Sequence, residues 1–210
     1  MGSDSRSDGR RKRTFIEEAR RAQIVSAAIG TVAEAGYAGA SLSRIAQRAG
    51  ISKGVISYHF SGKDELMERA VEQVYSDIAE FVLPRAAEAA DERSSLRTHI
   101  LAVGEYMRGH REQLLALAGI FSGTQTPEGT PRYRIRATES IYQGYSELLR
   151  AGQDRGVFRA FDTRVMAVSV QALIDGMFQY WVAYPDHDLE AHAAEVAELV
   201  DRATRADSPA

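Results

Sequence analysis

The chain has 210 residues, of which 44% are hydrophobic and 26% are charged, values typical of a globular protein that can bury a core. It contains no cysteine, which excludes a disulfide framework, a thiol nucleophile and cysteine-ligated zinc. No apolar run approaches the ~20 residues of a membrane span, and the N-terminus lacks the apolar segment of a signal peptide. We therefore expect a protein of the cytoplasm.

The net charge of −3 is distributed unevenly along the chain. Residues 1–63 hold 11 of the 26 basic residues and 5 of the 29 acidic residues, so this segment carries +6 and the remainder carries −9. A basic end on an acidic body indicates an anionic partner, for which nucleic acid is the usual candidate.

Helical periodicity begins after a polar N-terminal segment. Residues 1–13 lack any hydrophobic period and predict a disordered arm, which ends in the basic run 10–13. Apolar residues then recur at helical spacing between Ile24 and Val32, which predicts a first helix that Gly36 should close.

Two very short helices, over 41–49 and 52–60, follow with only a tight turn between them, which is typical of a helix-turn-helix unit. Ala46 supplies the small side chain that a close helix crossing needs. Gly50 supplies a residue that tolerates positive φ, and Ile56 supplies an inward apolar anchor. A plain helical hairpin within a bundle is the alternative interpretation of this spacing.

The rest of the chain also favours helices, and no segment alternates as a strand would. A capping box over 61–64 should begin a long helix that Pro84 ends or kinks. Three further helical stretches precede Asp162, which, like Asp188, is expected to cap one of the last two helices. The sequence therefore predicts an all-α fold of about nine helices.

The segment from Gly36 to Met67 resembles the N-terminal domain of the tetracycline-repressor (TetR) family of bacterial transcription regulators. The matching text is Gly36-Tyr37, the whole run 41–60, and the run 62–66. The resemblance implies a homodimer that binds an operator in double-stranded DNA and a small-molecule effector that releases it, as a repressor would. It divides the chain into a basic arm (1–13), a helix-turn-helix DNA-binding domain (14–62), a helical ligand-binding and dimerisation domain (63–205) and a tail (206–210).

The second short helix offers its outward side chains to a major groove, because Ile56 and Phe60 face inward. Lysine and serine can donate to base edges and valine methyls can contact thymine, whereas the resemblance implies phosphate contacts for Tyr58 and His59. Packing within the domain is the alternative role for Tyr58 and His59, and a solvated tail is the alternative to minor-groove contact by the arm. The predicted DNA-binding residues are Ser41, Ser43, Arg44, Lys53, Gly54, Val55, Ser57, Tyr58, His59 and Lys63.

The helix over 162–183 is apolar on more than one face, which predicts that a second chain covers it, together with the helix after Asp188. Residues Val196 and Leu199 are expected at that interface. Aromatic and methionine side chains of the body form a candidate effector pocket, with Asp175 orienting the ligand, although plain core and an exposed polar stripe are the alternatives. The predicted ligand-binding residues are Tyr106, Met107, Phe121, Tyr142, Tyr145, Met166, Gln171, Asp175 and Phe178.

No residue pattern indicates catalysis. The five histidines lack metal-ligand spacing with acidic residues, and the chain has neither a phosphate loop nor a serine elbow. The sequence predicts no catalytic residue, no metal and no cofactor. A helical ligand-binding or enzymatic bundle that does not touch DNA remains the alternative to a regulator.

Overall fold

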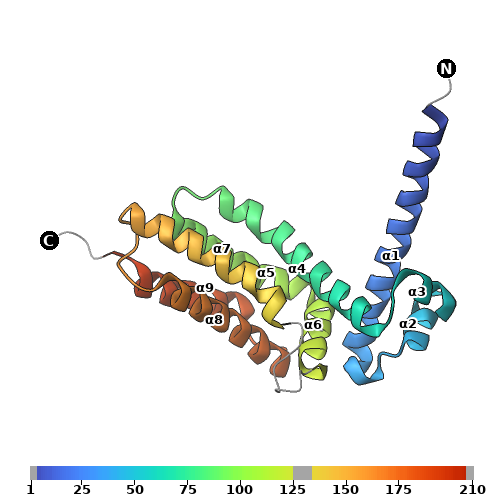
Figure 1. Cartoon of the computed structure of the whole chain (residues 1–210). Helices are drawn as coiled ribbons and strands as arrows, with labels where there is room; N and C mark the ends of the chain where they lie inside the picture. Colours follow the sequence, from blue (N-terminus) through green and yellow to red (C-terminus); the bar gives the residue numbers. More distant parts are fainter. Residues whose placement is uncertain (1–3, 125–133, 207–210) are drawn as a thin grey trace. The chain divides into compact units, whose positions relative to one another are not determined.

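The computed structural model describes the backbone of residues 4–124 and 134–206 and the side chains of residues 15–124 and 138–206. Within these ranges the chain forms nine helices, and its single β-bridge pairs Phe158 with Arg205, so the predicted all-α fold is confirmed (Figure 1). The helices are α1 (Asp4–Gly39), α2 (Leu42–Ala49), α3 (Lys53–His59), α4 (Lys63–Ala87), α5 (Glu92–Gly109), α6 (Arg111–Gly123), α7 (Arg134–Asp154), α8 (Thr163–Ala183) and α9 (Leu189–Thr204).

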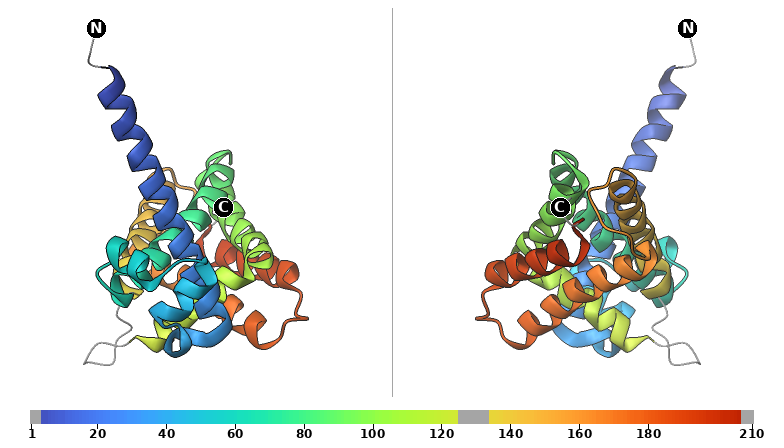
Figure 2. Two further views of the ribbon diagram at one scale, coloured as in Figure 1. Left: turned by 90° about the vertical axis from the view of Figure 1, so that its right-hand side faces the viewer. Right: turned by 90° about the vertical axis from the view of Figure 1, so that its left-hand side faces the viewer.

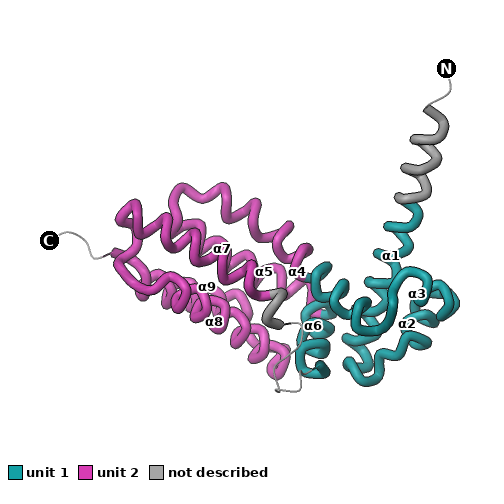
Figure 3. The backbone as a smooth tube through the Cα atoms, viewed as in Figure 1, with its two compact units in different colours: residues 1–74, 112–133 teal, residues 75–111, 134–210 magenta. Residues whose placement is uncertain are grey.

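The chain divides into two compact units, coloured separately in Figure 3. The first comprises residues 1–74 and 112–133, and the second comprises 75–111 and 134–210. This division differs from the expected boundary at 62/63 in two ways: α4 contributes to both units, and α6 belongs with the N-terminal unit. Glycines explain the second difference, because Gly119 and Gly123 let α6 approach α1 closely. A Cβ at Gly123 would lie 2.4 Å from the Cβ of Tyr37.

The core of the first unit lies between α1 and the short helices that follow it. Ile24, Ala28 and Val32 of α1 are buried, as are Ile45 of α2 and Ile56 of α3. The apolar period between Ile24 and Val32 therefore marks the buried face of α1, as the sequence predicts.

The second unit is a bundle in which α5 packs most extensively on α9, and α7 on α8. The two views of Figure 2 show these helices lying alongside one another. Gly104 permits the close approach of α5 to α9, because a Cβ there would lie 2.8 Å from the Cβ of Ala193. At the far end of the chain the Ala206 amide donates to the carbonyl of Val157 (3.1 Å), so Ala206 is anchored although we expected a tail from this residue. Residues 207–210 lie outside the described part.

Several helix ends follow the predicted signals. Asp162 accepts hydrogen bonds from the amides of Arg164 (2.8 Å) and Val165 (3.0 Å), and Asp188 accepts one from Ala191 (2.9 Å). Both residues are therefore the N-caps that the sequence predicts.

Three predicted boundaries were wrong or displaced. The helix α1 already begins at Asp4, so residues 4–13 are helical although we expected a disordered arm; the side chains of the basic run 10–13 lie outside those described. Gly36 interrupts α1 with a φ of 68°, as expected, but one more helical turn follows it. Pro84 lies inside α4, which ends three residues later at Ala87.

Candidate nucleic-acid interface

The turn between α2 and α3 has the geometry of a helix-turn-helix unit. Ser41 caps α2, its hydroxyl accepting from the amide of Arg44 (3.2 Å). Gly50 ends α2 in the left-handed region (φ 66°, ψ 31°), and the Ile51 amide donates to the carbonyl of Ala46 (3.0 Å). A side chain at position 50 would strain this conformation, so the glycine is what permits so tight a turn.

Apolar anchors hold the two short helices against α1. Ile45 and Ile56 are fully buried, and Ala46 and Phe60 are nearly so. The predicted inward face of the unit is therefore confirmed, and the remaining side chains of α3 are available on its outer face.

The outer face of α3 consists mainly of exposed polar residues. Tyr58 is 73% exposed, so the packing role considered for it is wrong. Val55 and His59 are half-buried, and the His59 ring meets the Tyr58 ring edge-on (centroids 5.0 Å apart). Of the ten residues predicted to bind DNA, those exposed in the structure are Ser41, Ser43, Arg44, Lys53, Gly54, Ser57 and Tyr58.

Arg21 fixes the C-terminal end of α3, a role that sequence reasoning missed. Its guanidinium donates to the carbonyl of His59, lies 4.3 Å from the centroid of the Phe60 ring and forms an ion pair with Glu65 (3.4 Å). A cation beside the last carbonyls of a helix is stabilised by the helix dipole. Nothing local in the sequence marks Arg21, because its partners lie 38 to 44 residues away.

The start of α4 is capped by a different acid from the one predicted. Glu65, and not Asp64, accepts hydrogen bonds from the amide (2.7 Å) and hydroxyl (2.8 Å) of Ser61. These bonds hold the pKa of Glu65 below its usual value, and the nearby Arg21 lowers it further. Because α4 begins at Lys63, two residues after Ser61, the reaching carboxylate falls one position later than in a standard capping box.

Lys63, a predicted DNA contact, is held within the first unit. Its ammonium donates to the carbonyl of Tyr37 and lies 3.8 Å from the centroid of the Tyr37 ring. Burial lowers the pKa of Lys63, and the adjacent Asp64 partly offsets this effect. The Lys63 side chain therefore braces α1 against α4, and only the backbone amides at the start of α4 remain suited to a phosphate.

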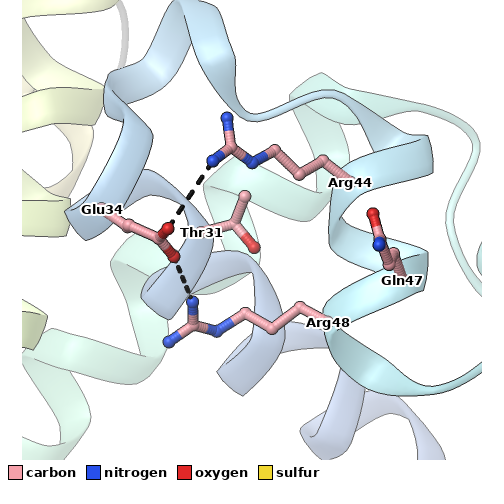
Figure 4. Close-up of a pocket in the computed structure, with 5 residues that line it drawn as sticks. All are labelled: Thr31, Glu34, Arg44, Gln47 and Arg48. Carbon is pink, nitrogen blue, oxygen red and sulfur yellow. Dashed lines mark hydrogen bonds and ion pairs between the residues drawn. The ribbon is translucent and has the colours of Figure 1, made fainter.

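A polar hollow between α1 and α2 is lined in part by Arg44, the arginine that is predicted to contact DNA (Figure 4). Glu34 pairs with both Arg44 (3.6 Å) and Arg48 (2.8 Å), and Arg48 also pairs with Glu112 at the start of α6 (3.1 Å). Gly30 makes room for this arrangement, because a Cβ there would lie 2.5 Å from the Arg48 guanidinium. Arg44 remains half-exposed and can exchange Glu34 for a phosphate, whereas Arg48 joins α2 to α6.

The predicted ligand-binding residues are divided between the two units. Phe121 lies on α6 of the first unit, and the other eight lie in the second. Tyr106, Met107, Tyr145 and Gln171 are buried there, whereas Tyr142, Met166, Asp175 and Phe178 are half-buried. The structure thus brings eight of the nine into one bundle.

Neither a metal group nor a membrane helix is found within the described ranges. No three His, Asp or Glu side chains gather there in a way that could hold a metal ion. Among the helices described, none combines the length and apolar character that a bilayer crossing requires.

Comparison with known proteins identifies the N-terminal unit. Residues 24–70 match the family described as bacterial regulatory proteins, tetR family. The N-terminal domain of this chain is a tetR-family domain. The matched segment runs from the buried face of α1 to the first turns of α4, so it contains the whole helix-turn-helix unit of the tetR-family domain.

The chain is also similar to individual transcriptional regulators and to solved structures. The chain is 40% identical over 88 residues to the HTH-type transcriptional regulator BetI 1 of Chromohalobacter salexigens, a match covering 42% of each chain. The matched region thus spans less than half the length of this curated relative. A transcriptional regulator of Rhodococcus sp. assigned to the TetR family superposes with a TM-score of 0.78 at 21% identity, over 88% of this chain and 98% of that one. FadR of Bacillus subtilis, solved with stearoyl-CoA, gives 0.76 at 22% identity, over 85% and 96%. At such identities the superpositions establish the fold alone, over 85% to 88% of this chain.

Proposed function

We propose that this chain is a transcriptional repressor that binds a near-palindromic operator as a homodimer and is released by a small molecule. The observation that carries the proposal is the tetR-family helix-turn-helix unit with an exposed polar outer face on α3. A helical bundle that does not touch DNA is not favoured, because the matched relatives are transcriptional regulators. We accordingly assign the protein no catalytic activity and place it in the bacterial cytoplasm, on the nucleoid when bound to DNA.

The DNA-binding role assigns different tasks to the exposed residues of α3. Lys53 is the first residue of α3, and Ser57 lies one turn later and is also exposed. A recognition helix meets base edges through such outward side chains. We propose that Tyr58, His59 and the capping hydroxyl of Ser41 contact phosphates, together with the backbone amides at the starts of α2 and α4.

The proposed dimer surface is the exposed face of α8, with Leu199 of α9 beside it. Val165 is 63% exposed and Leu199 is 54% exposed, and further apolar residues of α8 share this exposure, among them Val168, Ala172 and Tyr180. Two copies joined through such a face would remove it from water. The expected interface role of Val196 was wrong, because that side chain faces the core of its own unit and is 5% exposed.

The effector is proposed to bind in the second unit and to favour the spacing of the two DNA-binding units that does not fit the operator. FadR of Bacillus subtilis binds stearoyl-CoA, which supports a partly apolar effector for a fold of this kind. The long helix α4 supplies residues to both units and is the proposed lever.

The test is sequence-specific DNA binding by the full chain. Genomic fragments selected by the purified protein should share a near-palindromic site with half-sites at least one helical turn apart. Lys53→Ala should weaken binding to that site by roughly 1–3 kcal/mol and leave non-specific binding much less affected. Arg150→Ala, which removes an exposed arginine of α7, is the matched control and should bind as the unmodified chain does. Failure to enrich any sequence would overturn the proposed function.

A further inference from the structure

A group of polar side chains lies inside the second unit, where a helical bundle normally has only apolar ones. Tyr145 of α7 is 4% exposed, and its hydroxyl oxygen has no hydrogen-bond partner among the residues that the structure describes. The ring of His99 from α5 lies against it, with centroids 4.9 Å apart. On α8 the buried amide of Gln171 donates to the carboxylate of Asp175 (2.9 Å). The Asp175 carboxylate acts electrostatically on the Tyr145 hydroxyl, which links the pair on α8 to the pair on α5 and α7.

The unpaired Tyr145 hydroxyl is the unusual member of this cluster. A buried hydroxyl without a partner destabilises the folded protein, since it has lost its hydrogen bonds to water. Such a group is tolerated where a ligand provides the missing partner. An oxygen atom on the ligand would accept from the Tyr145 hydroxyl.

The charges around the cluster restrict the ligand chemistry further. Burial lowers the pKa of His99 to about 4, so its imidazole is neutral near pH 7 and offers an anion no compensating charge. Burial is the main cause that raises the pKa of Tyr145, and the negative charge of Asp175 raises it further. The Asp175 carboxylate therefore acts electrostatically on the Tyr145 hydroxyl. A ligand carboxylate placed at the Tyr145 hydroxyl would meet the same negative field.

We propose that the cluster of His99, Tyr145, Gln171 and Asp175 binds the neutral oxygen of a small apolar molecule, a hydroxyl or carbonyl, and selects against carboxylates. The inference rests on the proposed function, since it assigns the chemical class of the effector. Its apolar part would lie among the buried aliphatic residues of the same helices, such as Ile100, Leu149 and Met177.

The test uses two probes with the same aliphatic chain, 1-octanol and octanoate, titrated calorimetrically into the full chain without DNA. We expect 1-octanol to bind more tightly than octanoate. Tyr145→Phe should weaken 1-octanol binding about threefold to tenfold, as expected for one lost hydrogen bond. The same variant should keep or raise the melting temperature of the ligand-free protein, because it removes only an unpaired hydroxyl. Asp175→Asn should raise the affinity for octanoate about tenfold, because it removes the like charge.

Tyr184→Phe is the matched control, because it removes a hydroxyl from an exposed tyrosine just beyond α8 and should change neither affinity nor melting temperature. The proposal is overturned if 1-octanol does not bind, if octanoate binds as tightly, or if Tyr145→Phe binds 1-octanol unchanged. A lower melting temperature of ligand-free Tyr145→Phe would also overturn it, because the hydroxyl would then have a partner within the protein. Each of these results leaves operator binding untouched, so failure here is distinguishable from failure of the proposed function.

Discussion

The two units of this chain distribute polar and apolar side chains differently. The outer face of α3 in the N-terminal unit is polar over an apolar inner face, and its exposed residues include Lys53 and Tyr58. In the second unit, α8 exposes apolar side chains such as Val165, while the polar groups of Tyr145 and Gln171 are buried. The first surface suits a hydrated, charged partner, and the second suits a second chain outside and a small molecule inside. The chemistry of each proposed partner therefore follows from this difference between the two units.

The largest expected effect tests the apolar inner face of the N-terminal unit. Ile56→Ala should lower the free energy of unfolding by about 2–5 kcal/mol, because Ile56 is fully buried at the centre of the unit. Val55→Ala, one residue earlier and half-buried, should lower it by about 1 kcal/mol or less. Urea denaturation measures both, and equal losses would contradict the assignment of inner and outer faces.

The burial of His99 predicts a pH dependence that arises in the second unit. The folded pKa of about 4 lies below the ordinary value of 6.5, so the unfolded chain binds the extra proton first as pH falls. The contribution of His99 to stability is complete above pH 6.5 and is lost between pH 6.5 and 4, by at most about 1.4 kcal/mol per pH unit. His99→Gln should show a flatter pH dependence of unfolding in this window, and an identical slope would contradict the burial of the imidazole.

Two glycines of α7 differ in their surroundings: Gly152 packs closely against another side chain, whereas Gly144 faces open space. Gly152→Ala should destabilise the protein by about 1–3 kcal/mol, because its Cβ would lie 2.2 Å from the buried Phe158 ring. Gly144→Ala meets nothing within 4 Å and should stabilise the helix by up to about 1 kcal/mol. Thermal unfolding of both variants measures the difference, and a gain from Gly152→Ala would show that Phe158 does not pack as described.

The smallest expected effect concerns the ion pair that joins α6 to the helix-turn-helix unit. Glu112→Gln removes the Arg48–Glu112 pair, whose side chains are 40% and 61% exposed, so the cost should be less than about 1 kcal/mol. A double-mutant cycle with Arg48→Met isolates this pair from the one with Glu34. A coupling energy of several kcal/mol would show that the pair is far less screened by water than its exposure indicates.

The sequence predicts the N-terminal unit well because its features are local. Ser41 and Gly50 define α2 through interactions within a few residues. In the second unit, only the helix starts at Asp162 and Asp188 are defined as locally. The contacts that sequence reasoning missed join residues far apart in the chain. Arg21 clamps α3, and Arg48 joins α2 to α6. The residues next to an exposed arginine on a helix do not indicate which distant residue it will pair with.

In the second unit the sequence identified residues but not their environments. Asp175 and Gln171 were recognisable as a polar stripe, yet their spacing could not show that Gln171 is buried or that His99 lies against Tyr145. The prediction that Val196 lies at an interface was wrong for the same reason. Helical periodicity shows that α9 has an apolar face, but it does not show whether the same chain or a partner chain covers that face.

The most direct test of the account is the number of chains bound to one operator. Analytical ultracentrifugation of the complex should find two chains on one near-palindromic duplex. Leu199→Glu places a charge on the proposed dimer surface and should sediment as a folded monomer that no longer retains the operator at the same concentration. Glu105→Gln, a change at an exposed polar position of α5, should remain dimeric. One chain per duplex, or full operator binding by a monomeric Leu199→Glu protein, would contradict the account.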